Sequence, residues 1–171
     1  VLAWSRLEEG RFTARRVQVD VRGLLERATP ALERRLAEAE LALAVHADDA
    51  AAATVLSTDE DAIGQILFNL VDNAAKYARG SSPAVVELRA TANEQGVVLA
   101  VRDHGPGVAE AHRERIFAPF DRGAVAVSSN DVPGVGLGLA LARGLAQDLG
   151  GDLRLVAADG SGACFELRLP R

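Results

Sequence analysis

The chain has 171 residues, of which 49% are hydrophobic and 25% charged, a composition typical of one well-packed globular domain. Its net charge of −5 and scattered basic residues argue against generic nucleic-acid binding, so any anion site must be local. No apolar run is long enough to predict a transmembrane helix, and the single cysteine, Cys164, excludes an internal disulfide and a cysteine-based zinc site. Because it opens on Val1 in mid-pattern, we expect the chain to be excised from a longer one.

The first 56 residues predict a helix end, a helix and two short strands. Residues 1–9 are typical of the end of a helix that stops at Gly10. Apolar residues at near-helical spacing predict a helix over 21–40, and Pro30 is expected to interrupt it. Alternation predicts a short strand over 41–45, and the apolar run 53–56 is compatible with another.

The next helix is predicted over 57–77 and carries the most distinctive polar residues. Ser57 and Glu60 fit a capping box, and apolar residues then recur at helical spacing. About 120° around the helix from that apolar face runs a polar stripe, at about 100° per residue. The stripe is formed by Asn69, Asn73 and Lys76, the only lysine of the chain, followed by Tyr77, its only tyrosine. Two amide oxygens and an ammonium in this arrangement suit a hydrated divalent cation and the phosphates bound to it.

The remaining pattern predicts strands interleaved with helices. Strands are expected over 84–91 and 97–102, joined by a hairpin, and over 152–157 and 163–169, the last with Cys164 packed in the core. A short helix is expected over 110–117, a mobile loop over 121–134, and an amphipathic helix over 137–149. The fold class is therefore α+β: a two-layer α/β sandwich whose mixed β-sheet packs on helices on one face.

A strand end at residues 103–107 carries the sequence DHGPG. Its glycines, Gly105 and Gly107, let the backbone turn sharply and approach a ligand. The Asp103 carboxylate can accept a hydrogen bond from an exocyclic amine such as adenine N6, whereas guanine presents a carbonyl there. A plain turn is the alternative reading of this short motif.

Two further motifs suit a phosphate site. Residues 134–138 (GVGLG) open directly into a helix, where free backbone amides bind phosphate oxygens. They do not form a Walker A loop, because Gly-Lys-Ser/Thr occurs nowhere in the chain. In residues 117–122 (FAPFDR), the phenylalanines can be core residues, and Arg122 is either a surface residue or a γ-phosphate contact made on loop closure.

In this order the motifs resemble the N, G1, F and G2 boxes of the sensor histidine kinases, in the superfamily that includes Hsp90, DNA gyrase B and MutL. The closing GSGACFELRLP resembles the last glycine motif of the family, and SRLEEGRF resembles the end of its dimerisation hairpin. The resemblance implies a Bergerat-type ATP-binding fold. It also implies two parts: residues 1–12, the end of the dimerisation and phosphoacceptor hairpin, and residues 13–171, the ATP-binding catalytic domain.

The resemblance also implies roles for individual residues. Asn73 would be a Mg²⁺ ligand, Asn69 would lie near the metal and the terminal phosphates, and Lys76 and Tyr77 would contact the phosphates. Asp103 would bind adenine N6. The implied catalytic residues are Asn69, Lys76 and Arg122. The remaining residues implied to contact the nucleotide are Gly105, Gly107, Val108, Phe120, Gly134, Gly136, Leu137, Gly138 and Leu139.

The implied function is transfer of the γ-phosphoryl group of Mg–ATP to a histidine on a dimerisation domain absent from this chain, and onward to a response regulator aspartate. The implied partners are that dimerisation domain, within a homodimer, and a response regulator receiver domain. Nucleic acid and membrane contacts are not expected for this fragment. The implied location is cytoplasmic, either free or as the cytoplasmic part of a membrane-anchored receptor.

Three departures from the family pattern keep alternatives open. Val135 and Ala163 replace small hydroxyl residues, and none of His46, His104 and His112 lies in a predicted dimerisation helix. The main alternative is a catalytically weak ATP-sensing or partner-binding module of the same fold. A serine kinase of the anti-sigma type or a MutL-like ATPase fits less well, because of the flank at residues 1–12 and the Lys76-Tyr77 pair.

Overall fold

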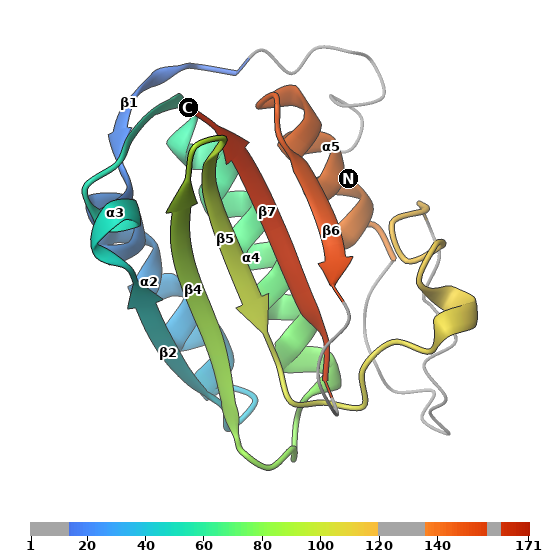
Figure 1. Cartoon of the computed structure of the whole chain (residues 1–171). Coiled ribbons are helices and arrows are strands. Elements are labelled where there is room, and N and C mark those ends of the chain that lie inside the picture. The colour runs from blue at the N-terminus through green and yellow to red at the C-terminus, as the bar shows by residue number, and fades with distance from the viewer. Residues whose placement is uncertain (1–13, 120–135, 157–161) are drawn as a thin grey trace.

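The computed structural model describes residues 14–119, 136–156 and 162–171. Within these ranges strands are interleaved with helices (Figure 1). In chain order the elements are β1 (Val17–Asp20), α2 (Val21–Ala37), β2 (Ala42–Ala47), α3 (Asp49–Ala52), β3 (Val55–Thr58), α4 (Glu60–Tyr77), β4 (Val85–Asn93), β5 (Gly96–Arg102), the 3₁₀ turn η1 (Glu110–His112), α5 (Gly138–Asp148), β6 (Asp152–Val156) and β7 (Cys164–Pro170). The strands β4 and β5 follow one another directly, as do β6 and β7.

The main sheet has five strands in the order β2-β4-β5-β7-β6. Only β2 and β4 pair in parallel, and the other neighbours are antiparallel. Helices α2, α4 and α5 lie together behind this sheet, and no described helix covers its other face (Figure 1). This arrangement confirms the predicted two-layer sandwich with a mixed sheet and helices on one face.

The core lies between the sheet and the three helices. Alternate residues of the central strands point into it, including Leu88 of β4, Leu99 of β5 and Leu167 of β7, all 0% exposed. The helix α4 presents the matching apolar face that its sequence spacing predicts, with Ile63, Ile66, Leu67, Leu70 and Val71 buried. The central position of α4 between α2 and α5 leaves its opposite flank free for polar residues.

The start of α4 differs from the sequence prediction. Ser57 and Thr58 do not cap the helix, because both belong to β3 and pair with β1 in a separate two-stranded sheet. The N-cap is Asp59, whose Oδ1 accepts a hydrogen bond from Ala62 N at 3.1 Å. Its Oδ2 accepts one from Arg15 N at 2.7 Å, so the same carboxylate also fastens the chain entering β1.

Pro30 does not interrupt α2 as expected, because the helix runs through it from Val21 to Ala37. A proline removes one helical hydrogen bond and leaves the carbonyl four residues earlier unpaired. Glu26 and Pro30 are both exposed, so water can satisfy that carbonyl.

Other differences are smaller. The structure adds β1 and α3, which the sequence pattern did not predict, and shortens the expected helix over 110–117 to η1 followed by turns. His46 lies within β2 rather than after it. The predicted helix end at residues 1–9 and the loop at 121–134 lie outside the described residues. No described helix is long and apolar enough to cross a membrane.

Candidate functional site

The end of β5 holds a buried carboxylate with one committed oxygen and one uncommitted oxygen. Asp103 is 6% exposed, and its Oδ1 accepts hydrogen bonds from Gly105 N at 2.9 Å and Ala163 N at 3.2 Å. Both of the Asp103 side-chain hydrogen bonds within the described residues use Oδ1, and none uses Oδ2. The carboxylate is thus held in place by the backbone while one oxygen stays available as an acceptor.

Burial raises the pKa of the Asp103 carboxyl above its ordinary value. The amides of Gly105 and Ala163 and the charge of His104 act in the opposite direction without cancelling that rise. His104 itself is held by Glu87, with Nε2 and Oε1 3.1 Å apart. A buried carboxylate that keeps a free oxygen is suited to a donor that a ligand supplies.

Glycines crowd around Asp103 because three segments meet there. A Cβ on Gly162, where φ is +109°, would lie 2.1 Å from the Asp103 carbonyl oxygen. A Cβ on Gly107, where φ is +74°, would lie 2.9 Å from the Gly162 carbonyl oxygen. A Cβ on Gly105 would lie 3.0 Å from the carbonyl oxygen of Tyr77, the last residue of α4. The glycines therefore let the strand end, the start of β7 and the end of α4 close on one another.

Asn69, on the polar flank of α4, faces the start of α5. Its Oδ1 accepts a hydrogen bond from Gln65 Nε2 at 3.3 Å, and it would lie 3.9 Å from a Cβ on Gly138. The Nδ2 atom of Asn69 is buried and without a partner among the described residues. The N-cap of α5 is Leu137, which makes no side-chain cap hydrogen bond, so this helix start keeps amide donors for a ligand.

Lys76 lies on the same flank but is already paired. Its Nζ is 2.6 Å from Asp72 Oδ2, and Arg35 Nε of α2 is 2.7 Å from Asp72 Oδ1. Burial alone would raise the pKa of the Asp72 carboxyl, but the hydrogen bonds and charges of Lys76 and Arg35 outweigh it, and the pKa lies below its ordinary value. Asp72 is therefore an anion bound between two cations.

The donor set of α4 suits a magnesium ion that brings its own phosphate ligands. Mg²⁺ takes oxygen ligands and is bound by few protein groups together with substrate phosphates. The Asn73 amide is half-buried and has no hydrogen-bond partner among the described residues. No group of three or more His, Cys, Asp or Glu side chains within the described ranges could form an all-protein cage. Asn73 and Asn69 thus fit a metal held largely by a nucleotide.

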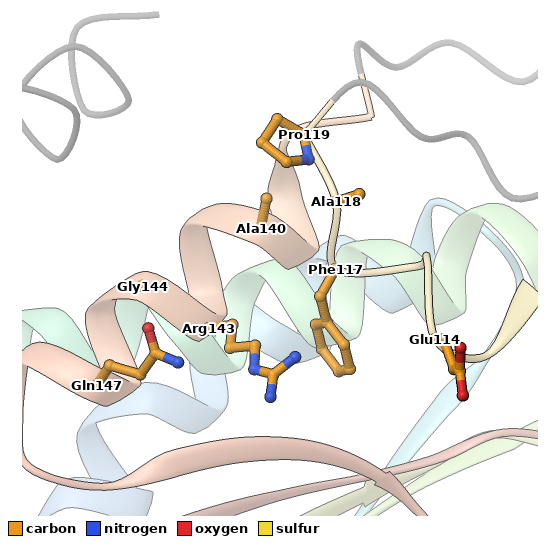
Figure 2. A pocket seen from close by; sticks show the side chains of 8 residues that line it. All are labelled: Glu114, Phe117, Ala118, Pro119, Ala140, Arg143, Gly144 and Gln147. Atoms are coloured by element: carbon orange, nitrogen blue, oxygen red, sulfur yellow. The ribbon is translucent and has the colours of Figure 1, made fainter.

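A separate hollow of about 330 Å³ lies between α5 and the segment after η1 (Figure 2). Phe117 forms one wall, edge-on to Phe165 at 6.2 Å between ring centroids, and the Arg143 guanidinium lies 4.8 Å from the Phe117 ring centroid. Asp103 does not line this hollow. Phe117 packs partly buried against the core, which is the structural alternative given for it above.

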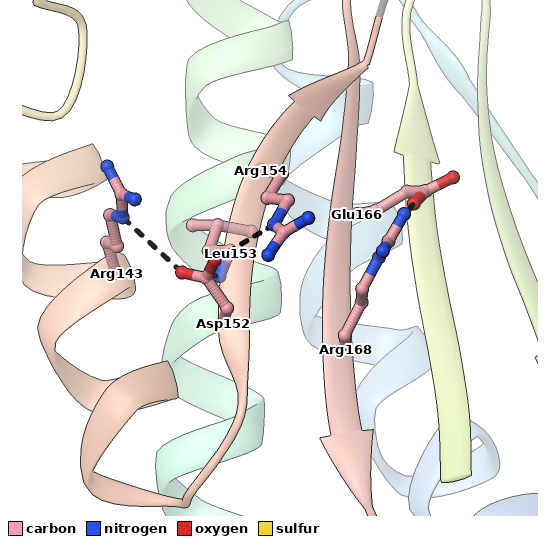
Figure 3. A network of polar contacts seen from close by, with 6 residues as sticks. All are labelled: Arg143, Asp152, Leu153, Arg154, Glu166 and Arg168. Atoms are coloured by element: carbon pink, nitrogen blue, oxygen red, sulfur yellow. Dashed lines mark hydrogen bonds and ion pairs between the residues drawn. The ribbon is translucent and has the colours of Figure 1, made fainter. Parts of the chain in front are cut away.

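The open face of the sheet is polar, and its charges are largely paired with one another (Figure 3). Asp152 of β6 contacts Arg154 at 2.9 Å and Arg143 of α5 at 3.4 Å, and Glu166 of β7 contacts Arg168 at 2.8 Å.

Cys164 begins β7 and is half-buried there rather than packed in the core as expected, because the side chain that points inward is the next one, Phe165. Burial raises the pKa of the Cys164 thiol, and the Glu166 carboxylate adds to the rise.

The structure thus brings the predicted site residues together at two ends of one region. Asp103, Gly105, Gly107 and the partly buried Val108 gather at the end of β5, beside Tyr77. Asn69 lies beside the start of α5, where Gly136, Leu137, Gly138 and Leu139 are found. Phe120, Arg122, Gly134 and Val135 lie outside the described residues.

Sequence reasoning missed four contributors to the site. The four-residue spacing of Asp72 to Lys76 and of Gln65 to Asn69 is a signal that could have revealed those two pairs. Nothing local indicated that Arg35 would lie beside Asp72, or that Gly162 would lie beside Asp103. Ala163 replaces a hydroxyl residue of the family pattern, but its two contacts to Asp103 use backbone atoms, so they do not need a hydroxyl.

A sequence profile of the family described as histidine kinase-, DNA gyrase B-, and HSP90-like ATPase matches residues 58–171, which include both ends of the site. The chain belongs to this family. The ATPase family therefore accounts for two thirds of the chain, from β3 to the end of β7, and ATP binding follows from membership.

Among curated proteins, the relatives of this ATPase domain include sensor kinases. The chain is 43% identical over 117 residues to the swarming motility regulation sensor protein RssA of Serratia marcescens, covering 68% of this chain and 24% of that protein. It is 33% identical over 171 residues to the autoinducer 2 sensor kinase/phosphatase LuxQ of Vibrio cholerae, covering 99% and 20%. The chain therefore spans about a quarter or less of the length of these relatives.

Solved structures of histidine kinases share its fold. Full-length ShkA in complex with AMPPNP superimposes with a TM-score of 0.77 at 30% identity, covering 99% of this chain and 35% of that one. The mycobacterial sensor histidine kinase MprB gives a TM-score of 0.73 at 29% identity, with 90% and 97% covered. The Acinetobacter baumannii kinase AdeS, at 24% identity and a TM-score of 0.75, supports the fold alone, with 99% and 74% covered.

Proposed function

We propose that this chain binds Mg–ATP and transfers its γ-phosphoryl group to a histidine on a dimerisation domain, from which the group passes to a response regulator aspartate. In this proposal residues 1–12 end the dimerisation hairpin and residues 13–171 form the catalytic domain. The observation that carries it is the Asp103 carboxylate, which is fixed by two backbone amides through one oxygen, while no described residue forms a hydrogen bond with the other.

At the base end, Asp103 Oδ2 accepts a hydrogen bond from the adenine N6 amine. A guanine would place a carbonyl oxygen against the same carboxylate, and two acceptors without a proton between them repel. Because Asp103 is buried, this mismatch cannot be relieved by water at little cost, so adenine is preferred. Gly105, Gly107 and Val108 border the base.

At the phosphate end, Asn73 and Asn69 provide amide groups, and Lys76 and Arg122 provide positive charge. The Nδ2 of Asn69, to which no residue in the described ranges is hydrogen-bonded, is a donor that a phosphate oxygen would satisfy. A bound Mg²⁺ would supply further neutralisation of the phosphate charge, held by Asn73 with Asn69 close by. The start of α5, with Gly136, Leu137, Gly138 and Leu139, supplies backbone amides, and Phe120 and Gly134 would complete the border of the site.

Phosphoryl transfer requires little covalent chemistry from the protein. Catalysis is mainly positioning and electrostatic stabilisation of charge on the transferring group. Asp103 fixes the base, and Lys76 and Arg122 stabilise charge at the far end of the nucleotide. The acceptor histidine and the group that assists it belong to the partner domain, so the isolated chain should hydrolyse ATP only very slowly. We place this reaction in the cytoplasm.

Two measurements test the proposal. Calorimetry with ATP and GTP in the presence of Mg²⁺ should show binding of ATP and much weaker binding of GTP. Incubation with a dimerisation domain that carries the histidine, using γ-labelled ATP, should then give an acid-labile phosphoprotein. Asn73→Ala should abolish the label while the protein stays folded. ATP binding without any label would instead favour the ATP-sensing module, and equal binding of GTP would contradict the base assignment.

A further inference from the structure

The lysine at the phosphate end is the last member of a chain of charges that crosses from α2 to α4 and begins with Glu38, whose Oε2 lies 3.3 Å from an Arg35 guanidinium nitrogen. Arg35 Nε of α2 lies 2.7 Å from Asp72 Oδ1, and Asp72 Oδ2 lies 2.6 Å from Lys76 Nζ. The side chains of Arg35, Asp72 and Lys76 are about three-quarters buried, with exposures of 22%, 25% and 26%. This degree of burial makes the contacts stronger than those of ordinary surface ion pairs.

Lys76 stands between its present partner and the proposed phosphate site. At about 100° per residue, Asp72 lies about 40° from Lys76 around the helix, and Asn73 lies about 60° away on the other side. A lysine side chain is long and flexible enough to reach either neighbour. Asp72 and a nucleotide phosphate are therefore alternative partners for one ammonium.

We propose that Asp72 competes with the nucleotide phosphates for Lys76, and that Arg35 weakens this competition by sharing the charge of Asp72. The inference rests on the proposed function, in which Lys76 binds the phosphates. It makes Asp72 and Arg35 positioning residues that set how much of the binding free energy comes from the phosphates. It also connects α2, which carries none of the proposed site residues, to the affinity of that site.

The physical reason is the charge left behind when Lys76 turns to a phosphate. A largely buried carboxylate that loses one of its cations is less well compensated, which is costly. Arg35 remains hydrogen-bonded to Asp72 Oδ1 and lowers that cost. Without Arg35, Asp72 should hold Lys76 more tightly, and without the Asp72 charge, Lys76 should be free for the nucleotide.

Two substitutions should therefore act in opposite directions. Asp72→Asn should tighten Mg–ATP binding by about 3- to 10-fold, and Arg35→Gln should weaken it by about 3-fold, in line with the strength of partly buried ion pairs. The affinity for ADP should change in the same directions, and the affinity for adenosine should stay constant within experimental error. The measurement is calorimetric titration of the chain with each ligand.

A matched control separates the local effect from net charge. Asp61 is exposed in the first turn of the same helix, about 16 Å from Asp72 along the axis, so Asp61→Asn makes the same charge change at a distance. It should leave ATP affinity nearly unchanged. In a Lys76→Ala background, Asp72→Asn should also have no effect on ATP affinity, because the competition no longer has a target.

The single lysine offers a direct spectroscopic readout. Reductive ¹³C-methylation gives a signal from Lys76 besides that of the amino terminus. In the unsubstituted chain this signal should move on addition of Mg–ATP and stay in place with adenosine. In Asp72→Asn it should start from a shifted position before any nucleotide is added.

The outcomes separate this inference from the proposal on which it rests. If Asp72 and Arg35 have only a structural role, Asp72→Asn and Arg35→Gln should both lower the melting temperature and both weaken ATP binding. That result, or an Asp72→Asn effect that persists with Lys76→Ala, would overturn the competition. If Lys76→Ala itself keeps full ATP affinity, the assignment of Lys76 to the phosphates is what fails.

Discussion

The two ends of the candidate site are built from different materials. The base end is made of backbone, where a buried carboxylate is held by two amides and glycines allow three segments to touch. The phosphate end combines side chains of α4 with the amides at the start of α5, and its lysine is engaged in an ion pair. In the proposed function, the base end is therefore formed before adenine binds, whereas binding of phosphate requires Lys76 to exchange partners.

The base end should break most severely when the close approach of its segments is blocked. Gly162→Ala would place a Cβ 2.1 Å from the Asp103 carbonyl oxygen at a residue with φ of +109°. We expect a loss of about 2–4 kcal/mol in the free energy of unfolding, together with loss of nucleotide binding. Urea denaturation and calorimetry check this, and a variant with unchanged stability would show that the contact is not tight.

Asp103→Asn should separate binding from stability. The asparagine Oδ1 can still accept from Gly105 and Ala163, but its amide donor would face the N6 donor of adenine. We expect about 100-fold weaker binding of both ATP and adenosine. The melting temperature should be unchanged or higher, because the cost of burying a charge disappears. A large fall in melting temperature would mean that the charge itself holds the fold.

Lys76→Ala should affect only the other end. We expect ATP to bind about 5- to 10-fold more weakly, the value of one charge-assisted contact, while adenosine binding stays nearly intact. Calorimetric titration with ATP, ADP and adenosine checks this. Equal losses for ATP and adenosine would contradict the division of the site into two ends.

Ligand binding at the base end should also depend on pH in a way that binding at the phosphate end does not. Because burial raises the folded-state pKa of Asp103, its contribution to stability is fully present below the unfolded-state pKa and is lost as the pH rises through the folded-state value. Binding follows the opposite trend, since a proton on the carboxyl group would occupy Oδ2, the oxygen proposed to accept from N6, while Oδ1 stays bonded to the two amides. Adenosine affinity should therefore fall gradually on acidification, at a pH where an ordinary aspartate is still ionised. Asp103→Asn should remove this dependence.

The smallest effect is expected at a glycine whose position has room for a side chain. Gly64 lies inside α4, and a Cβ there meets nothing within 4 Å. Gly64→Ala should stabilise the domain by about 0.5–1 kcal/mol by raising helix propensity, and should leave ATP and adenosine affinities unchanged. Thermal unfolding measures this change in stability, and Gly162→Ala serves as the comparison at a glycine where a side chain would clash. Weaker adenosine binding in Gly64→Ala would mean that the packing of α4 sets the geometry of the base end.

The fold was largely predictable because its long elements have strong periodicity. The apolar spacing of α4 and the alternation of β4 and β5 gave both their type and their approximate bounds. The failures are places where tertiary pairing decides. Ser57 and Thr58 have side chains suited to a helix cap, but both pair with β1 in a sheet, so the N-cap is Asp59.

The residues proposed for the site could be identified from the sequence where one residue type carries the chemistry. The aspartate and glycines of DHGPG and the asparagines of α4 could be identified from their own order in the chain. The structure added partners that no local pattern indicates: Arg35 reaches Asp72 from another helix, and the amide of Ala163 comes from 60 residues beyond Asp103. Such contacts depend on how elements pack, which spacing along the chain does not encode.

The hydrogen bond from Ala163 N to Asp103 has a consequence for the order of folding. During synthesis, one of the two amides that fix this carboxylate is missing until β7 has left the ribosome. Until then the central strand β5 also lacks a neighbour. A nascent chain should therefore gain affinity for adenine only when its final strand docks. Bound nucleotide would then favour the complete domain over every shorter intermediate, because a ligand stabilises only the state that binds it.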